Sequence, residues 1–97
     1  MNFETIKSRA QLVFAGKPIK KAFLFGSHAR LESHLNSDLD ILVELDEDKV
    51  IGMIEYIKII EELEMAFQTK VDLVSSDSVS KHLKPFIDSD KLLIYEA

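Results

Sequence analysis

The chain has 97 residues, of which 46% are hydrophobic and 30% charged, and this composition is typical of one globular domain with a modest core. Its net charge of -5 disfavours a nucleic-acid-binding role, so no direct nucleic-acid substrate is expected, and the lack of cysteine excludes disulfides, thiol catalysis and cysteine-ligated zinc. Because the sequence has neither a signal-peptide core nor a run of about 18 apolar residues, we expect a cytoplasmic protein with no membrane partner.

The sequence of the first half of the chain predicts two helices and two strands. Gly16 and Pro18 end a helix over residues 3–15. A strand is predicted over residues 19–25, a short helix over residues 27 to about 32, and a second strand over residues 39–45. The first helix carries apolar residues at helical spacing, namely Ile6, Ala10, Val13 and Phe14.

The second half continues with an acidic turn at residues 46–48 and a long helix over residues 49–67. A third strand is predicted over residues 70–75, then a short helix mixed with a proline-led turn, and a last strand over residues 92–96. We therefore expect an α/β (α+β) fold within one domain, residues 1–97: a small mixed sheet with helices mainly on one face.

The long helix has a broad apolar arc that we expect to face the core. This arc contains Met53, Tyr56, Ile57, Ile59, Ile60, Leu63 and Phe67. Three further apolar residues fall among charged ones on the predicted solvent side: Ile51, Ile54 and Met65. They are either scattered exposed residues or a contact patch for a partner.

Two acids stand at the head of the second strand, in the sequence SDLDILV. Residues two apart in a strand share a face, so Asp38 and Asp40 point the same way and the alternate apolar residues point into the core. Carboxylates at this spacing form either an exposed polar strand face or a set of oxygen ligands of the kind that Mg²⁺ prefers.

A third acid, Asp72, lies in the short apolar strand KVDLVS. An acid between apolar residues is expected to be buried, and an unpaired buried carboxylate is costly. If this strand lies beside residues 39–45, Asp72 joins the other two acids and the three could hold two metal ions. The alternative is an aspartate at a strand end that faces water.

Gly26 and Ser27 follow the first strand, and they could form a cradle for an anion. Glycine lets a ligand approach the backbone closely, and a helix that starts at Ser27 would point free N–H groups at a phosphate. Arg30 falls one turn later on the same side and could contact phosphate oxygens.

Taken together, these residues resemble a known family. The chain resembles the DNA polymerase beta-like nucleotidyltransferase superfamily, above all its minimal nucleotidyltransferases (MNT). The resemblance lies in the pair Gly26-Ser27, followed after ten residues by Asp38-Leu39-Asp40. The segments FGSHAR, SDLDILV, VDLV and the ending LKPFIDSDKLLIYEA are all similar to the family's sequences, so the resemblance covers nearly the whole chain. The chain departs from the common pattern at His28 and Leu31.

The resemblance implies an enzyme and assigns roles to the site residues. Gly26 and Ser27, with Arg30, would bind a nucleotide triphosphate, and ATP is the expected donor. Asp38 and Asp40 would hold Mg²⁺ as two ions, and Asp72 would be the third ligand or would orient the attacking hydroxyl. AMP would then pass to an acceptor hydroxyl while pyrophosphate leaves.

The resemblance also implies a partner, because larger relatives carry an additional domain for the acceptor and these 97 residues leave no room for one. The expected partner is a HEPN-domain ribonuclease toxin, with a tyrosine as the acceptor, so that the chain acts as antitoxin in a hetero-oligomer. The alternative is a non-catalytic antitoxin that binds nucleotide or partner and neutralises the toxin by forming a complex.

Overall fold

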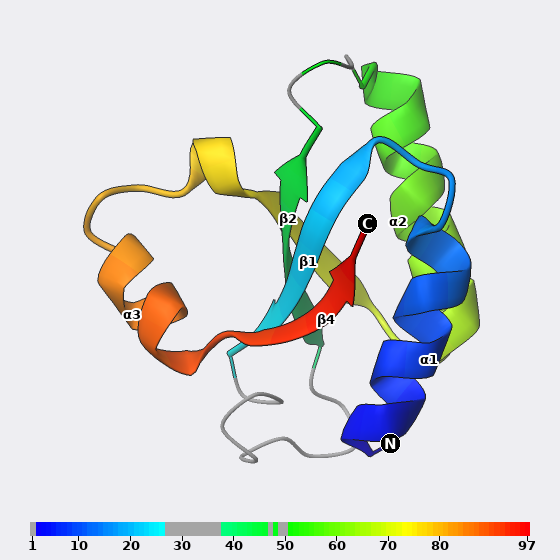
Figure 1. The fold of residues 1–97 in the computed structure, drawn as a ribbon, viewed down its shortest axis with the longest axis horizontal. Helices are drawn as coiled ribbons and strands as arrows, with labels where there is room; N and C mark the ends of the chain where they lie inside the picture. The colour runs from blue at the N-terminus through cyan, green and yellow to red at the C-terminus, as the bar shows by residue number, and fades with distance from the viewer. Residues whose placement is uncertain (1, 27–37, 47, 49–50) are drawn as a thin grey trace.

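A computed structural model of the protein describes residues 2–26, 38–46, 48 and 51–97. Its elements, shown in Figure 1, follow in chain order as α1 (Phe3–Phe14), β1 (Ile19–Phe25), β2 (Leu39–Leu45), α2 (Met53–Phe67), β3 (Val71–Ser75), the 3-10 helix η1 (Ser76–Ser78), α3 (Lys84–Asp90) and β4 (Leu92–Glu96).

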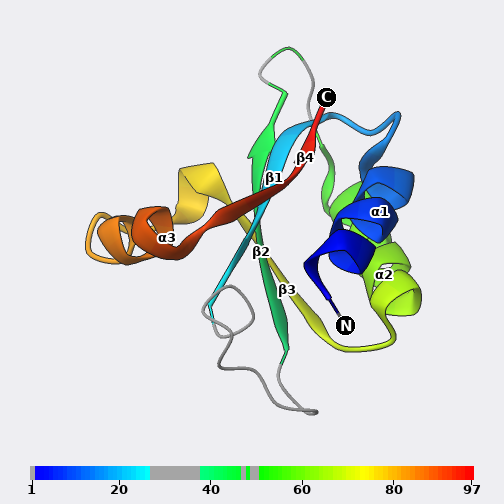
Figure 2. The same cartoon turned by 60° about the horizontal axis from the view of Figure 1, so that its bottom comes forward.

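The four strands form one sheet in the order β3-β2-β1-β4. β1 pairs antiparallel with both β2 and β4, whereas β2 and β3 are parallel and are joined through α2. α1 and α2 lie on one face of the sheet, and η1 and α3 project from the other side, as Figure 2 shows. The predicted mixed sheet with helices mainly on one face is confirmed.

Local sequence signals account for the first helix and the strands. The Asn2 side chain caps α1 by accepting a hydrogen bond from the Thr5 N–H at 2.8 Å. Gly16, with φ +81°, turns the chain after the helix. The strands over residues 19–25, 39–45 and 92–96 have the predicted bounds.

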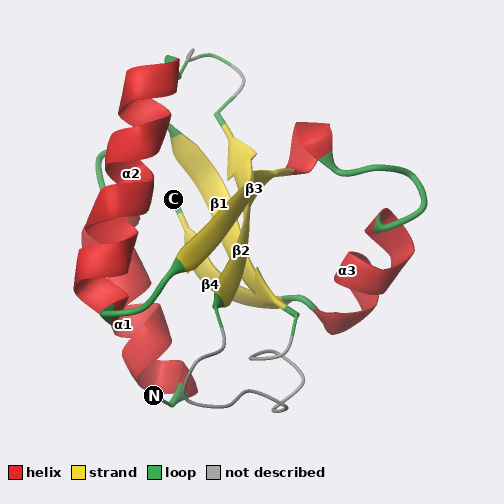
Figure 3. Ribbon diagram, turned by 180° about the vertical axis from the view of Figure 1, so that it is seen from behind, coloured by secondary structure: helices red, strands yellow, loops and turns green. Residues whose placement is uncertain are grey.

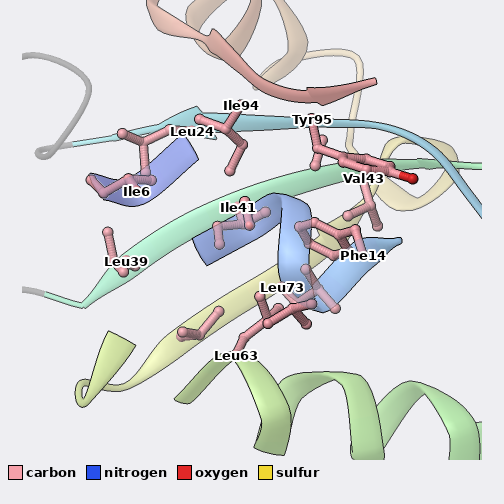
Figure 4. Packing of buried hydrophobic residues seen from close by; sticks show 14 of the residues in the cluster. Ile6, Phe14, Leu24, Leu39, Ile41, Val43, Leu63, Leu73, Ile94 and Tyr95 are labelled. Atoms are coloured by element: carbon pink, nitrogen blue, oxygen red, sulfur yellow. The ribbon is translucent and has the colours of Figure 1, made fainter. Parts of the chain in front are cut away.

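The core lies between the sheet and the pair α1 and α2, as Figure 4 shows. The four predicted core residues of α1 are all buried, and Phe14 is completely so. Three of the four apolar residues predicted to face the core from β2, Leu39, Ile41 and Val43, are buried, and the fourth, Leu45, packs against the cluster while partly exposed.

The long helix differs from its prediction in three ways. It begins at Met53, after Gly52, instead of at residue 49, and residues 49 and 50 lie outside the described ranges. Met53 and Ile57 are 76% and 46% exposed, so the covered face is narrower than the apolar arc. Ile51, predicted on the solvent side, packs partly buried against the core, while Ile54 and Met65 are exposed as expected.

The last part of the chain also differs in detail from the prediction. Pro85 is the second residue of α3 and lies in its first turn, instead of leading a separate turn. Among the described residues, no helix is long and apolar enough to cross a membrane.

Candidate active site

Two of the predicted acids are neighbours across the parallel strands. Asp40 of β2 is in register with Asp72 of β3, so their alpha carbons lie about 5 Å apart and their side chains leave the same face of the sheet. The adjacent residues on both strands, Leu39, Ile41, Val71 and Leu73, are buried under the helices. Asp40 and Asp72 therefore belong to the outer face, opposite α1 and α2.

Asp38 stands just before β2, at the same end of the sheet. Its neighbour Leu39 donates a backbone hydrogen bond of 3.0 Å to the carbonyl of Lys70, the residue that precedes β3. This bond fixes the start of β2 beside the start of β3, which brings residues 38–40 alongside residues 70–72. Asp38 is exposed and Asp40 is half-buried.

Gly26 lies directly after β1, where Phe25 pairs with Asp40. Its φ of +76° is a conformation that favours glycine. A Cβ at this position would collide with the Asp40 Oδ2 atom and would lie 3.1 Å from its Cγ atom. The Asp40 carboxylate thus occupies the space that a side chain at position 26 would need.

The structure corrects one expectation about the third acid. Asp72 was predicted to be buried within its strand, but its side chain is exposed. The reason is that β3 is an edge strand and Asp72 points to the outer face, away from the helices that bury Val71 and Leu73. The adjacency of the two strands, on which the three-acid hypothesis depended, is confirmed.

The other half of the predicted site cannot be compared with the structure. Ser27 and Arg30 lie outside the described residues, as do the short helix predicted after Ser27 and the departures His28 and Leu31. Their roles in nucleotide binding therefore stay predictions.

Tyr56 is a residue near the site that sequence reasoning assigned only to the core. Its hydroxyl donates a 2.5 Å hydrogen bond to the Leu73 carbonyl, next to Asp72. Burial raises the pKa of the Tyr56 hydroxyl above its usual value, and the charge of Asp72 raises this pKa further. No local motif marks this residue, because the contact depends on how α2 packs along β3.

The chemistry of the acids fits a magnesium ion, since all of their donors are carboxylate oxygens. Asp40 and Asp72 are close enough in register to share one ion. Among the described residues, however, no three acidic or histidine side chains form a ready-made metal-binding group. The donor type fits Mg²⁺, but the full ligand set is not preformed within these ranges.

Comparison with known proteins identifies the family. The family described as polymerase beta, nucleotidyltransferase, matches residues 5–97. The chain belongs to this family. The predicted membership, and with it the prediction of a nucleotidyltransferase enzyme, is confirmed.

Relatives of known sequence are similar over almost their whole length. Two chains of Methanocaldococcus jannaschii, each named "putative protein adenylyltransferase", are 37% identical over 93 residues and 34% identical over 84 residues. The first match covers 95% of this chain and 91% of the relative, and the second covers 87% and 88%.

Solved structures share the fold. A "putative minimal nucleotidyltransferase" superposes with a TM-score of 0.78 at 27% identity and covers 95% of both chains. A complex of tri-AMPylated Shewanella oneidensis HEPN toxin with MNT antitoxin matches with a TM-score of 0.73 at 18% identity, over 99% of this chain and 74% of the matched chain. At that identity the second likeness concerns the fold alone.

Proposed function

We propose that this chain transfers AMP from ATP to a hydroxyl of a partner protein. The observation that carries the proposal is the placement of Asp40 in register with Asp72 and against Gly26, at one end of the outer sheet face. In a member of a nucleotidyltransferase family, paired carboxylates beside a glycine turn are suited to a nucleotide triphosphate. The names of the two archaeal relatives support protein as the acceptor.

Within this proposal residues 1–97 act as one domain. Each site residue has a role in it. Asp38 and Asp40 hold Mg²⁺ with the triphosphate, and Asp72 completes the ligand set or orients the acceptor. Gly26 lets the phosphates approach the backbone, while Ser27 and Arg30 contact phosphate oxygens. When bound, Mg²⁺ would neutralise phosphate charge and stabilise the attacking and leaving oxygens.

The transfer itself is a substitution at the α-phosphorus. The acceptor oxygen forms a bond to this phosphorus, the bond to the bridging oxygen of the β-phosphate breaks, and pyrophosphate leaves. The acceptor hydroxyl loses its proton, and we assign the exposed Asp72 carboxylate of the outer face as the group that accepts it. The protein therefore works by positioning and by charge, without a covalent intermediate.

We further propose that the partner is a HEPN-domain toxin, that the acceptor is a tyrosine, and that the chain acts as its antitoxin in the cytoplasm. The likeness in fold to the MNT chain bound to an AMPylated HEPN toxin supports this assignment. Each AMP group adds negative charge and bulk to the toxin, which would repel and occlude RNA.

The proposal is tested by incubating the chain with Mg²⁺, ATP and a purified HEPN protein encoded next to it. Intact mass spectrometry should find one or more AMP units on the HEPN protein, and peptide mapping should place them on tyrosine. Omission of Mg²⁺ should abolish the transfer.

The same experiment separates a second candidate, an antitoxin that acts by binding alone. A HEPN protein that is silenced in a stoichiometric complex yet gains no mass would contradict the enzymatic proposal and support the binding one.

A further inference from the structure

A cavity lies on the outer face of the sheet, beyond the candidate active site. It has a volume of about 430 Å³, is partly open to solvent, and lies between β2, η1, α3 and the segment that joins η1 to α3. Figure 3 shows η1, this segment and α3 standing beside the sheet. Its lining residues are Leu42, Glu44, Ser76, Asp77, Val79, Lys84, Ile87, Asp88 and Lys91.

The cavity and the candidate active site share strand β2 and the same outer face of the sheet. Asp40, Leu42 and Glu44 alternate along β2 and therefore leave the same outer face. Leu42 lies about 7 Å and Glu44 about 13 Å along the strand from Asp40. A nucleoside that is bonded to a phosphate held at Asp40 would span this distance.

The floor of the cavity is apolar. Leu42 is only 5% exposed although it points away from the main core, to whose buried cluster it does not belong. It pairs with Phe23 on one side and with Val74 on the other, and Val79 and Ile87 add apolar surface from the helical side. This floor suits a flat, uncharged ring system.

The rim of the cavity is polar and carries both signs of charge. Lys91 is engaged, because its Nζ atom lies 3.0 Å from the Asp88 carboxylate and 4.6 Å from the centre of the Phe23 ring. Lys84, in contrast, has no carboxylate partner in the described part of the chain. The three acids of the lining outnumber the two lysines, so a phosphate group would be repelled from the cavity.

We propose, on the basis of the proposed function, that this cavity binds the purine nucleoside of the donor nucleotide, while the triphosphate stays at Asp40 and Gly26. A purine edge offers both hydrogen-bond donors and acceptors. The Lys84 ammonium can donate to a ring nitrogen or carbonyl, and the carboxylates of Glu44 and Asp77 can accept from an amino group.

Calorimetry with two probes tests the assignment: the ATP analogue AMP-PNP and inorganic tripolyphosphate, each with Mg²⁺. Lys84→Ala removes the ammonium donor, and it should weaken AMP-PNP binding about three- to tenfold, the range for one hydrogen bond. Val79→Trp fills the cavity and should weaken AMP-PNP binding at least about tenfold. Tripolyphosphate affinity should be unchanged in both variants.

Matched controls come from exposed positions on the helices of the opposite face. Lys58→Ala also removes an exposed lysine charge, and Leu12→Trp adds the same side chain at a residue that is 82% exposed. Neither control should change the affinity for either probe. Thermal melts without ligand identify any variant that does not fold. If Val79→Trp does not fold, the result for Lys84→Ala alone tests the assignment.

Two outcomes would overturn the cavity assignment alone: unchanged AMP-PNP affinity in the variants, or a parallel loss of tripolyphosphate affinity. The second would mean that Lys84 acts on phosphate charge. A wild-type chain that binds neither probe would overturn the proposed function and the cavity assignment together. The failure of each proposal is therefore recognisable.

Discussion

At position 26 two independent requirements exclude any side chain. The backbone φ of +76° is a left-handed conformation, which costs other residues about 1–2 kcal/mol. In addition, the Asp40 carboxylate fills the space that a Cβ would take. Gly16 has a similar φ of +81°, but nothing lies within 4 Å of its Cβ position. The chain thus contains a matched pair in which the collision can be separated from the backbone strain.

Gly26→Ala should therefore destabilise the fold more than Gly16→Ala. Both variants share the backbone strain, and the collision with Asp40 is an additional cost at position 26 alone. Urea unfolding gives the two free energies of unfolding, and AMP transfer should be lost in Gly26→Ala but kept in Gly16→Ala. Equal losses of stability and activity would mean that Asp40 moves aside without consequence.

At the scale of elements, α2 covers the outer edge of β3 with side chains. The Val71 N–H donates to the Glu64 carboxylate at 3.1 Å, and the Leu73 carbonyl accepts from the Tyr56 hydroxyl at 2.5 Å. Edge strands with free backbone groups invite pairing with other chains, and these two bonds occupy such groups. The same contacts hold the strand that carries Asp72.

Tyr56→Phe should cost about 0.5–1.5 kcal/mol of stability near neutral pH, because the Leu73 carbonyl loses its donor. The cost should also depend on pH. The pKa of Tyr56 is raised in the folded state, so above about pH 10 the unfolded chain releases this proton first and wild-type stability falls with rising pH.

The difference in free energy of unfolding between wild type and Tyr56→Phe should thus be constant below about pH 9 and should shrink above pH 10. Urea unfolding at pH 7, 9 and 10.5 measures it, and the subtraction removes the titration of the lysines, which the two proteins share. A difference that grows with pH would contradict a raised pKa.

Elements with strong periodicity and clear end signals could be predicted from the sequence. Gly16 and Pro18 mark the end of α1, and Gly26 marks the end of β1. The predicted start of α2 at residue 49 was too early, because Lys49, Val50 and Ile51 do not break a helix by their type alone. The width of its buried face was overestimated, since an apolar arc does not reveal how much of a helix its neighbours cover.

The candidate site was predictable as a set of residues but not as an arrangement. The spacing of the Gly-Ser pair and the acids resembles a family signature, which marks the residues. The sequence does not show that β2 and β3 are neighbours, so the parallel pairing that sets Asp40 beside Asp72 could only be assumed. The cavity under α3 and the contact of Tyr56 with β3 join segments distant in sequence, and no local pattern encodes such contacts.

At the scale of the whole molecule, nucleotide binding should appear as added stability. A ligand at 100 times its Kd raises the free energy of unfolding by about 2.7 kcal/mol. Mg²⁺ with ATP should therefore raise the Tm of the wild type, whereas a variant with both Asp38→Asn and Asp40→Asn should fold but gain no such stability. Equal gains in the two proteins would contradict the metal-site assignment.

The parallel pairing of β2 with β3 has a consequence for the order of events during synthesis. Asp38 and Asp40 emerge from the ribosome before α2, whereas Asp72 emerges after it, and the parallel strands cannot pair until the whole crossover is available. Non-local pairings of this kind form late, because the chain between them must first be ordered. A growing chain that stops within α2 therefore carries the family's Gly-Ser and Asp-x-Asp residues without a complete site, and we expect transfer to begin only after β3 has been released.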